Sequence, residues 1–141
     1  SRRQSMGTLP DRSGEGMSSD ATKRFGERLL GIYTGAVLTK LIEIGYLVGL
    51  FEGSRAGPAT SAELADRLGL KERYVREWLG AMATSGIYSY DPVSGRYSLS
   101  DEHAALLTGD SAQNAAPMSR MINHFGTHLS KLTVEADGVL S

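Results

Sequence analysis

Three histidines are the side chains of this sequence best suited to chemistry near neutral pH. His124 and His128 lie four residues apart, a spacing that places two imidazoles on one face of a helix, where they can share a metal ion. No glutamate follows His124 and no third ligand is evident, so we expect no metal site and assign these histidines to the surface or to a pocket rim. His103 has no partner that the sequence makes visible.

Other catalytic patterns are missing from the sequence. The chain has no cysteine, which excludes disulfides and thiolate zinc sites. It shows no Ser/His/Asp spacing, no phosphate-binding loop and no glycine fingerprint after a strand. The glycines interrupt stretches that are expected to be helical and do not join a strand to a helix. We therefore predict no catalytic residue.

Residues 59–100 carry the order of elements that is typical of a winged helix: short strand, helix, turn, helix and hairpin. Ser61 is expected to cap a helix over residues 62–68, and Gly69 to close it in the left-handed conformation. Residues 71–85 are expected to form the second helix, ending before Gly86. Its apolar stripe contains Val75, Leu79, Met82 and Ala83. Residues 87–90 and 96–99 are expected to form a hairpin.

The charge of the chain argues against nucleic acid as a partner. The formal net charge is −1, whereas duplex binders are usually basic because they neutralise phosphates. The second helix offers Lys71, Arg73 and Arg76, but two glutamates accompany them. Tyr74 and Trp78 share the face opposite the apolar stripe and favour a protein contact there. The alternative is that Trp78 packs beneath the N-terminal arm.

Residues 25–51 form a strongly apolar arm. A membrane span is not expected, because Lys40 and Glu43 lie within the stretch and charges there are costly in lipid. A helix that is apolar nearly all round must be covered, and one winged helix offers too little surface, so we expect a homodimer. Paired glycines either allow close helix packing or break the arm into shorter helices. The dimer-interface candidates are Gly31, Gly35, Leu38, Ile42, Gly45, Gly49, Tyr74 and Trp78.

Two further helices are expected after the hairpin. Ser100 is a good N-cap for a helix that ends at Gly109. An amphipathic helix resumes after Pro117. The apolar stripe of this helix is expected to be part of the hydrophobic core. The alternative is that it lines an apolar pocket whose shape can adapt to a ligand. The stripe contains Met118, Met121, Ile122, Phe125, Leu129 and Leu132.

Four segments of the sequence carry a family resemblance: LTKLIEIGYLVGLFE, TSAELADRLGL, VREWLGAMATSGIY and GRYSLSDEHAALLTGD. They resemble the N-terminal region of two-domain S-adenosylmethionine-dependent methyltransferases, a group that includes small-molecule O-methyltransferases. The resemblance covers roughly residues 22–135. It implies a helical arm and a winged helix used for dimerisation and for closing over substrate. It also implies S-adenosylmethionine in the full-length protein, none bound by this chain alone, and substrate-lining roles for Met118, Met121, Ile122 and Phe125.

The expected fold is mainly α: a winged helix-turn-helix with an N-terminal helical dimerisation arm and a C-terminal helical extension. We expect a disordered segment over residues 1–20, the arm over 21–56, the winged helix over 57–110, and over 111–141 a helical linker toward a catalytic domain that is missing here. The expected function is the dimerisation and substrate-lid domain of a cytoplasmic methyltransferase, inactive alone. A winged-helix transcriptional regulator and a dimeric ligand-binding module are the alternatives. The acceptor substrate is not identified by the sequence.

Overall fold

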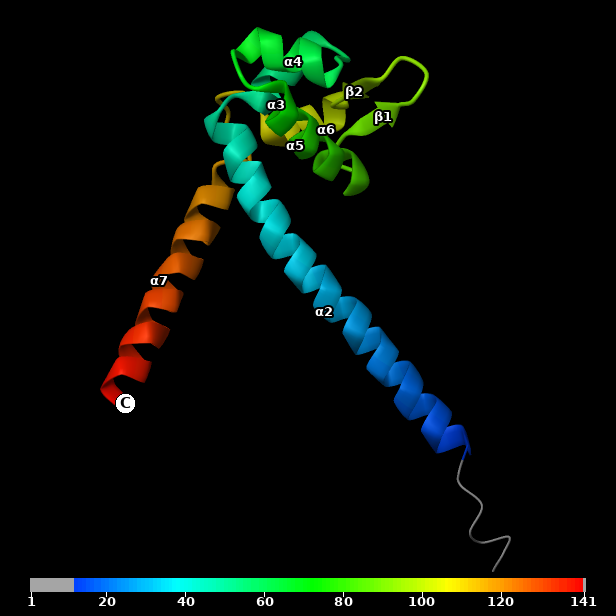
Figure 1. Ribbon diagram of the computed structural model, residues 1–141, viewed down its shortest axis with the longest axis vertical. Helices are drawn as coiled ribbons and strands as arrows, with labels where there is room; N and C mark the ends of the chain where they lie inside the picture. Colours follow the sequence, from blue (N-terminus) through cyan, green and yellow to red (C-terminus); the bar gives the residue numbers. More distant parts are fainter. Residues whose placement is uncertain (1–11, 141) are drawn as a thin grey trace, which may run out of the picture. The chain divides into compact units, whose positions relative to one another are not determined.

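The computed structural model describes the backbone of residues 12–140 and the side chains of residues 16–132. The chain divides into two compact units, Ser1–Ala36 and Val37–Ser141. The elements, labelled in Figure 1, are α2 (Arg12–Leu47), α3 (Leu50–Gly53), η1 (Ser54–Ala56), α4 (Ser61–Leu68), α5 (Glu72–Thr84), β1 (Ser89–Asp91), β2 (Arg96–Ser98), α6 (Asp101–Leu107) and α7 (Met118–Leu140).

Helix α2 is a single uninterrupted helix of 36 residues. It passes through Gly26, Gly31, Gly35 and Gly45, so of the two alternatives the one in which these glycines break the arm into shorter helices is wrong. Each glycine weakens a helix by only about 1 kcal/mol, and every further residue of a formed helix adds a hydrogen bond. The chain does break at Gly49, whose φ is 82°.

The start of α2 also differs from expectation. Residues 12–20, which were expected to be disordered, form its first turns, and the Thr22 hydroxyl donates to the Ser18 carbonyl at 2.9 Å. A nucleated helix extends over such residues because propagation costs little. Residues 1–11 lie outside the described part of the chain.

Helices α4 and α5 form the helix-turn-helix. Gly69 adopts a φ of 66° and ends α4, as predicted. The N-cap of α4, however, is Thr60 and not Ser61: the Thr60 hydroxyl accepts from the Glu63 N–H at 3.1 Å, and the Glu63 carboxylate accepts from the Thr60 N–H at 3.0 Å. This reciprocal pair satisfies two backbone donors at the start of the helix.

The wing is the antiparallel pair β1–β2, in which Tyr90 lies opposite Tyr97. Ala59 adds a single bridge to the same hairpin, exchanging backbone hydrogen bonds with Tyr97 at 3.0 and 2.8 Å. The strand, helix, helix and hairpin order is therefore present, and the predicted winged helix-turn-helix class is confirmed.

An aromatic cluster forms the centre of the core in the second unit. Phe51, Trp78 and Tyr88 lie with ring centroids 5.2 to 6.2 Å apart, largely edge to face. Val75, Leu79 and Met82 of the predicted stripe are at most 2 % exposed. The stripe on α5 is therefore confirmed as core, and Leu38, Leu41 and Ile42 of α2 pack against the same core.

Candidate functional site

A groove lies between the end of α2, the turn before β1, α6 and the start of α7, all within the second unit. Its volume is about 500 Å³, within the range of about 300–1,000 Å³ that small-molecule sites occupy. We call it the α2–α6–α7 groove. Its lining residues are Thr39, Ile42, Ser85, Gly86, Ile87, His103, Leu106, Leu107, Ala115, Met118, Ser119 and Ile122.

His103 supplies the imidazole of this groove. Its Nδ1 lies 2.8 Å from the carbonyl oxygen of Ile87, a partner that the sequence did not reveal. Its backbone N–H donates to the Ser100 hydroxyl at 3.2 Å, which confirms Ser100 as the N-cap of α6. The Ser100 cap thus fixes the backbone of His103 at the start of α6, and the turn before β1 holds its ring.

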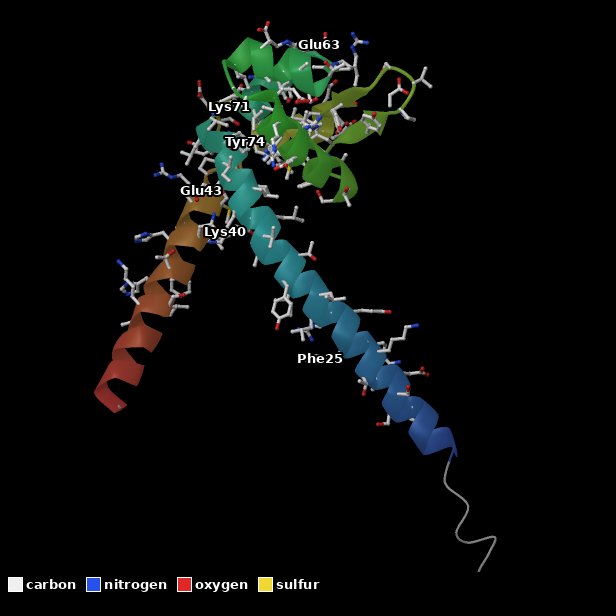
Figure 2. All side chains as sticks on the ribbon, viewed as in Figure 1. Phe25, Lys40, Glu43, Glu63, Lys71 and Tyr74 are labelled. Carbon is white, nitrogen blue, oxygen red and sulfur yellow. The ribbon has the colours of Figure 1, made fainter. Side chains whose placement is uncertain are left out.

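Polar contacts hold the first turns of α7 against α2. Glu43 is the shared partner: Arg120 Nε lies 3.6 Å from one of its carboxylate oxygens, and Asn123 Nδ2 donates to the other at 3.2 Å. Asn123 Nδ2 also lies 3.3 Å from the Thr39 carbonyl oxygen. Figure 2 labels Glu43 on α2. These contacts place the start of α7 along the groove.

The link between α6 and α7 is anchored by Glu52 of α3. The Gly109 N–H donates to the Glu52 carboxylate at 2.6 Å, and Arg55 pairs with the same carboxylate at 3.1 Å. The Gly109 hydrogen bond, followed by Arg55, lowers the pKa of Glu52. Asn114 then returns a hydrogen bond to the Gly109 carbonyl at 2.9 Å. The link therefore has a defined path from one helix to the next.

The four substrate-lining candidates do not all line the same hollow. Met118 and Ile122 line the α2–α6–α7 groove. Met121 lines a neighbouring, more polar hollow with Glu43 and His124. Phe125 is 61 % exposed and lines neither. The structure therefore brings two of the four candidates together.

The dimer-interface candidates are similarly divided. Tyr74, labelled in Figure 2, lies on α5. Its side chain is 62 % exposed, whereas Trp78 is 4 % exposed and donates from Nε1 to the Leu41 carbonyl at 2.8 Å. The expected exposed Tyr–Trp pair is thus wrong, and the alternative, that Trp78 packs beneath the arm, is what the structure shows. Gly45 is buried against the Trp78 ring, so its close contact lies within the chain.

The remaining dimer-interface candidates, on α2 and just after it, differ in their surroundings. A Cβ at Gly31 or Gly35 would meet nothing within 4 Å. Leu38 and Ile42 are partly buried against the core. Gly49 occupies the left-handed position before α3 and does not belong to a helical face. Gly31 and Gly35 are therefore the candidates that leave room for a second helix.

Large apolar side chains remain exposed on two helices. On α2 they are 37 to 71 % exposed: Met17, Phe25, Leu30, Ile32, Tyr33, Val37, Ile44, Tyr46 and Leu47. On α7 they are 47 to 66 % exposed: Met118, Met121, Ile122, Phe125, Leu129 and Leu132. Contiguous apolar surface of this kind usually marks an interaction site.

One described helix is long and apolar enough to cross a membrane: the segment Gly16–Leu47 has a mean hydropathy of 1.2 over its best window, of which 6 % is buried. Length and composition alone are weak grounds for a span. Lys40 and Glu43 lie in this segment, and Glu43 bonds to α7.

The outer face of α5 carries balanced charges. Arg73 pairs with Glu77 at 3.6 Å, and Arg76 pairs with Glu72 at 3.7 Å. In the wing, Arg96 pairs with Glu63 at 3.3 Å. Within residues 16–132, no three His, Asp or Glu side chains come together as a metal site.

Together the elements define a winged helix-turn-helix domain with long flanking helices. The profile of the Rv2258c-like winged HTH domain matches residues 36–109, and the chain belongs to this family. The chain matches no curated protein sequence.

Solved structures share this fold, and two of the three described here are named as methyltransferases. PigF with SAH is 25 % identical, with a TM-score of 0.61 over 70 % of this chain and 32 % of its own. The mitomycin 7-O-methyltransferase MmcR is 26 % identical, with a TM-score of 0.62 over 72 % of this chain and 30 % of its own. Human N-acetylserotonin methyltransferase in complex with SAM, at 17 % identity and a TM-score of 0.58, shares the fold over 70 % of this chain and 30 % of its own.

The chain thus spans about a third of the length of these structures. The expected resemblance to S-adenosylmethionine-dependent methyltransferases is confirmed, and it supports an N-terminal domain of such enzymes.

The described residues do not fit S-adenosylmethionine, the cofactor that the resemblance implies. A Rossmann-type site needs a parallel strand, a glycine-rich loop and a helix N-terminus in succession. In residues 12–140 the sheet is one antiparallel pair, β1–β2.

Proposed function

We propose that these residues form the N-terminal dimerisation and substrate-lid domain of an S-adenosylmethionine-dependent small-molecule methyltransferase. The observation that carries the proposal is the exposed apolar surface on α2 and α7, flanking a winged helix whose described cations on α5 are paired. The likeness to PigF with SAH and to MmcR supports the reaction class.

The exposed row on α2 is assigned to a second copy of the chain. Tyr33 and Val37 lie four residues apart and are each 59 % exposed, so they present one face of the helix. A second α2 can cover this face. Gly31 and Gly35 are not part of it, because two residues turn a helix by about 200° and place them on the opposite side. We prefer this partner to a membrane because Lys23, Arg24 and Glu27 also lie on the helix, and charges are costly in lipid. The proposal places the protein in the cytoplasm.

The role of the lid is assigned to the α2–α6–α7 groove and the start of α7. Met118 and Ile122 are half exposed there and offer apolar contact to a small molecule. Apolar cover excludes water from a reacting group and helps to orient it. The proposal assigns the methyl donor to the full-length protein and not to these 141 residues.

Light scattering of the 141-residue chain at micromolar concentration tests the proposal. We expect a dimer, and we expect Tyr33→Glu to shift the mass toward the monomer. Arg24→Glu is the matched control, because nine residues of a helix place Arg24 on the opposite face from Tyr33. A stably folded wild-type monomer would contradict the proposal, as would equal dissociation by both variants.

A further inference from the structure

The neighbouring hollow that contains Glu43 and His124 lies between α2 and a different face of α7. We call it the α2–α7 hollow. Its volume is about 710 Å³, and it shares no lining residue with the α2–α6–α7 groove. The two sites use different faces of α7 because two residues turn a helix by about 200°, which separates His124 from Ile122 of the groove. The polar lining of the hollow comes mainly from Lys40, Glu43 and Tyr46 of α2 and from Arg120, Asn123 and His124 of α7.

The α2–α7 hollow carries more positive than negative charge. Lys40 and Arg120 are its cations, and Glu43 is the carboxylate of its lining. That carboxylate is already engaged by α7, with Arg120 Nε 3.6 Å from one oxygen and Asn123 Nδ2 3.2 Å from the other. Lys40 is exposed and pairs with no carboxylate among residues 16–132. Its charge is therefore available to an anion.

His124 lies beside Lys40 across the two helices. Its neighbour Asn123 contacts the carbonyl oxygen of Thr39, the residue before Lys40, at 3.3 Å, which places His124 at the level of Lys40. The imidazole of His124 has no hydrogen-bond partner in the part of the chain whose side chains the structure describes. An ammonium and an imidazole N–H can both donate to one carboxylate, and such charge-assisted hydrogen bonds are the stronger ones.

Apolar surface continues from this end of the hollow. Met121 and Tyr46 line it, with side chains that are 66 and 37 % exposed. Tyr46 follows Lys40 by six residues, which is about 9 Å along a helix. A hydrocarbon body of this length can pack on the flexible Met121 side chain and the Tyr46 ring. A small inorganic anion would leave that surface uncovered, so an organic anion fits the hollow better.

We propose that the α2–α7 hollow binds a small organic carboxylate, whose charged group contacts Lys40 and His124 and whose apolar body packs on Met121 and Tyr46. Because these residues come from both helices, the bound molecule adds a contact between α2 and the start of α7. A ligand that binds only the folded chain stabilises it. The carboxylate therefore acts as an effector that holds α7 against α2, a role that goes beyond the proposed function and does not depend on it.

The test compares two probes that differ in charge. The probes 2-naphthoate and 2-naphthamide have the same ring system, but the amide is neutral. Dissociation constants are measured for the 141-residue chain by fluorescence titration at low ionic strength. Exposed ion pairs are weak, so we expect 2-naphthoate to bind about 2- to 5-fold more tightly. Added salt should reduce this preference because it screens exposed charges.

Lys40→Gln removes the cation and keeps most of the side chain. We expect the preference for 2-naphthoate to disappear, with the affinity for 2-naphthamide nearly unchanged, and we expect Lys40→Arg to keep the preference. Lys71→Gln is the matched control, because it removes the same charge from an exposed lysine at the N-cap of α5, outside the hollow. Figure 2 labels both lysines. This variant should keep the preference.

The contribution of His124 is tested in the same way. His124→Phe removes the donor of the imidazole and should weaken the binding of 2-naphthoate about 2-fold or more. His128→Phe is its control, because His128 is an exposed histidine of α7 that does not line the hollow. The effector role predicts that 2-naphthoate raises the midpoint of thermal unfolding more for the wild type than for Lys40→Gln.

A preference that survives Lys40→Gln would overturn the assignment, and so would one that Lys71→Gln abolishes equally. A wild-type chain that binds both probes equally, or neither, would overturn it as well. Light scattering of the same samples separates this site from the dimerisation role. A dimer without a preference removes the site alone, and a monomer that prefers 2-naphthoate through Lys40 removes the dimerisation role alone.

Discussion

Gly45 sets the distance between α2 and α5 at the centre of the core. An added Cβ would overlap Trp78 Cζ2 and lie 2.9 Å from Phe51 Cε2. Both neighbours are ring atoms of buried side chains, which cannot rotate out of the way as the end of a flexible chain can. The sequence pattern of paired glycines indicated close packing, but it did not show that the partner is the chain's own tryptophan.

We expect Gly45→Ala to lower the free energy of unfolding by about 1–3 kcal/mol, the usual cost of overpacking a core. Gly80→Ala in α5 is the matched control, because its Cβ would meet nothing within 4 Å and alanine favours the helix by up to about 1 kcal/mol. Urea unfolding of both variants measures the difference. A neutral Gly45→Ala would show that the aromatic cluster is loosely packed.

Tyr88 gives the fold a pH dependence at alkaline pH. Its side chain is 3 % exposed, and its hydroxyl shares a 2.7 Å hydrogen bond with the Ser54 hydroxyl, which donates to the Leu50 carbonyl at 2.8 Å. Burial raises the pKa of Tyr88 well above its ordinary value of 10.0. The folded state therefore keeps the proton that the unfolded state loses above that pH.

The stabilisation of the neutral phenol is fully present below pH 10 and is lost as the pH rises toward the folded-state pKa. We expect the free energy of unfolding to fall by up to about 1.4 kcal/mol per pH unit above pH 10 on account of this group. Tyr88→Phe should show a shallower decline than the wild type. Equal slopes for the two proteins in urea titrations between pH 9 and about 11.5 would contradict this account.

At the scale of the element, sequence patterns predicted the helix-turn-helix well. Two local signals were sufficient to place its two helices. They are the helical spacing of Val75, Leu79 and Met82 and the glycine at position 69, which ends α4 in the left-handed conformation. The hairpin followed from its turn residues. The cap of α4 was misassigned by one residue, although Thr60 and Glu63 already had the spacing of a capping box.

The groove could be predicted only in part. The helical period placed Met118 and Ile122 on one stripe, but not which side chains would face them. His103 and Ile87 are sixteen residues apart in the sequence. Their contact depends on how the hairpin places α6 next to the turn before β1. Sequence periodicity carries no information about such contacts between elements.

The cap of α4 provides a test at this scale. Thr60→Ala removes the acceptor of the Glu63 N–H, and we expect it to lower the free energy of unfolding by about 1 kcal/mol. Ser61→Ala is the control. Its hydroxyl donates to Glu72 at 3.0 Å and does not cap the helix, so its loss should cost less. Thermal unfolding compares the two, and a larger effect at Ser61 would restore the assignment made from the sequence.

At the scale of the whole molecule, charge separates a winged helix that binds DNA from one that assembles proteins. The formal net charge is −1. Arg73 and Arg76 on α5 are paired with glutamates, and Arg96 of the wing is paired with Glu63. A phosphate would have to displace these carboxylates, and counterion release from DNA supplies most of the affinity of non-specific binding only where cations are available.

We therefore expect the chain to bind mixed-sequence duplex DNA more weakly than the ~10⁻⁴–10⁻⁶ M that is typical of non-specific binders at physiological salt. Fluorescence anisotropy with a labelled duplex measures this affinity. The double variant Glu72→Gln and Glu77→Gln is a sensitive comparison, because it releases two arginines of α5 while the wing stays paired. If paired charge is the reason for weak binding, the variant should bind more tightly than the wild type, and its affinity should fall more steeply as salt rises. Sub-micromolar binding by the wild type, with a steep salt dependence, would instead favour a transcriptional regulator over a domain that serves dimerisation and substrate binding.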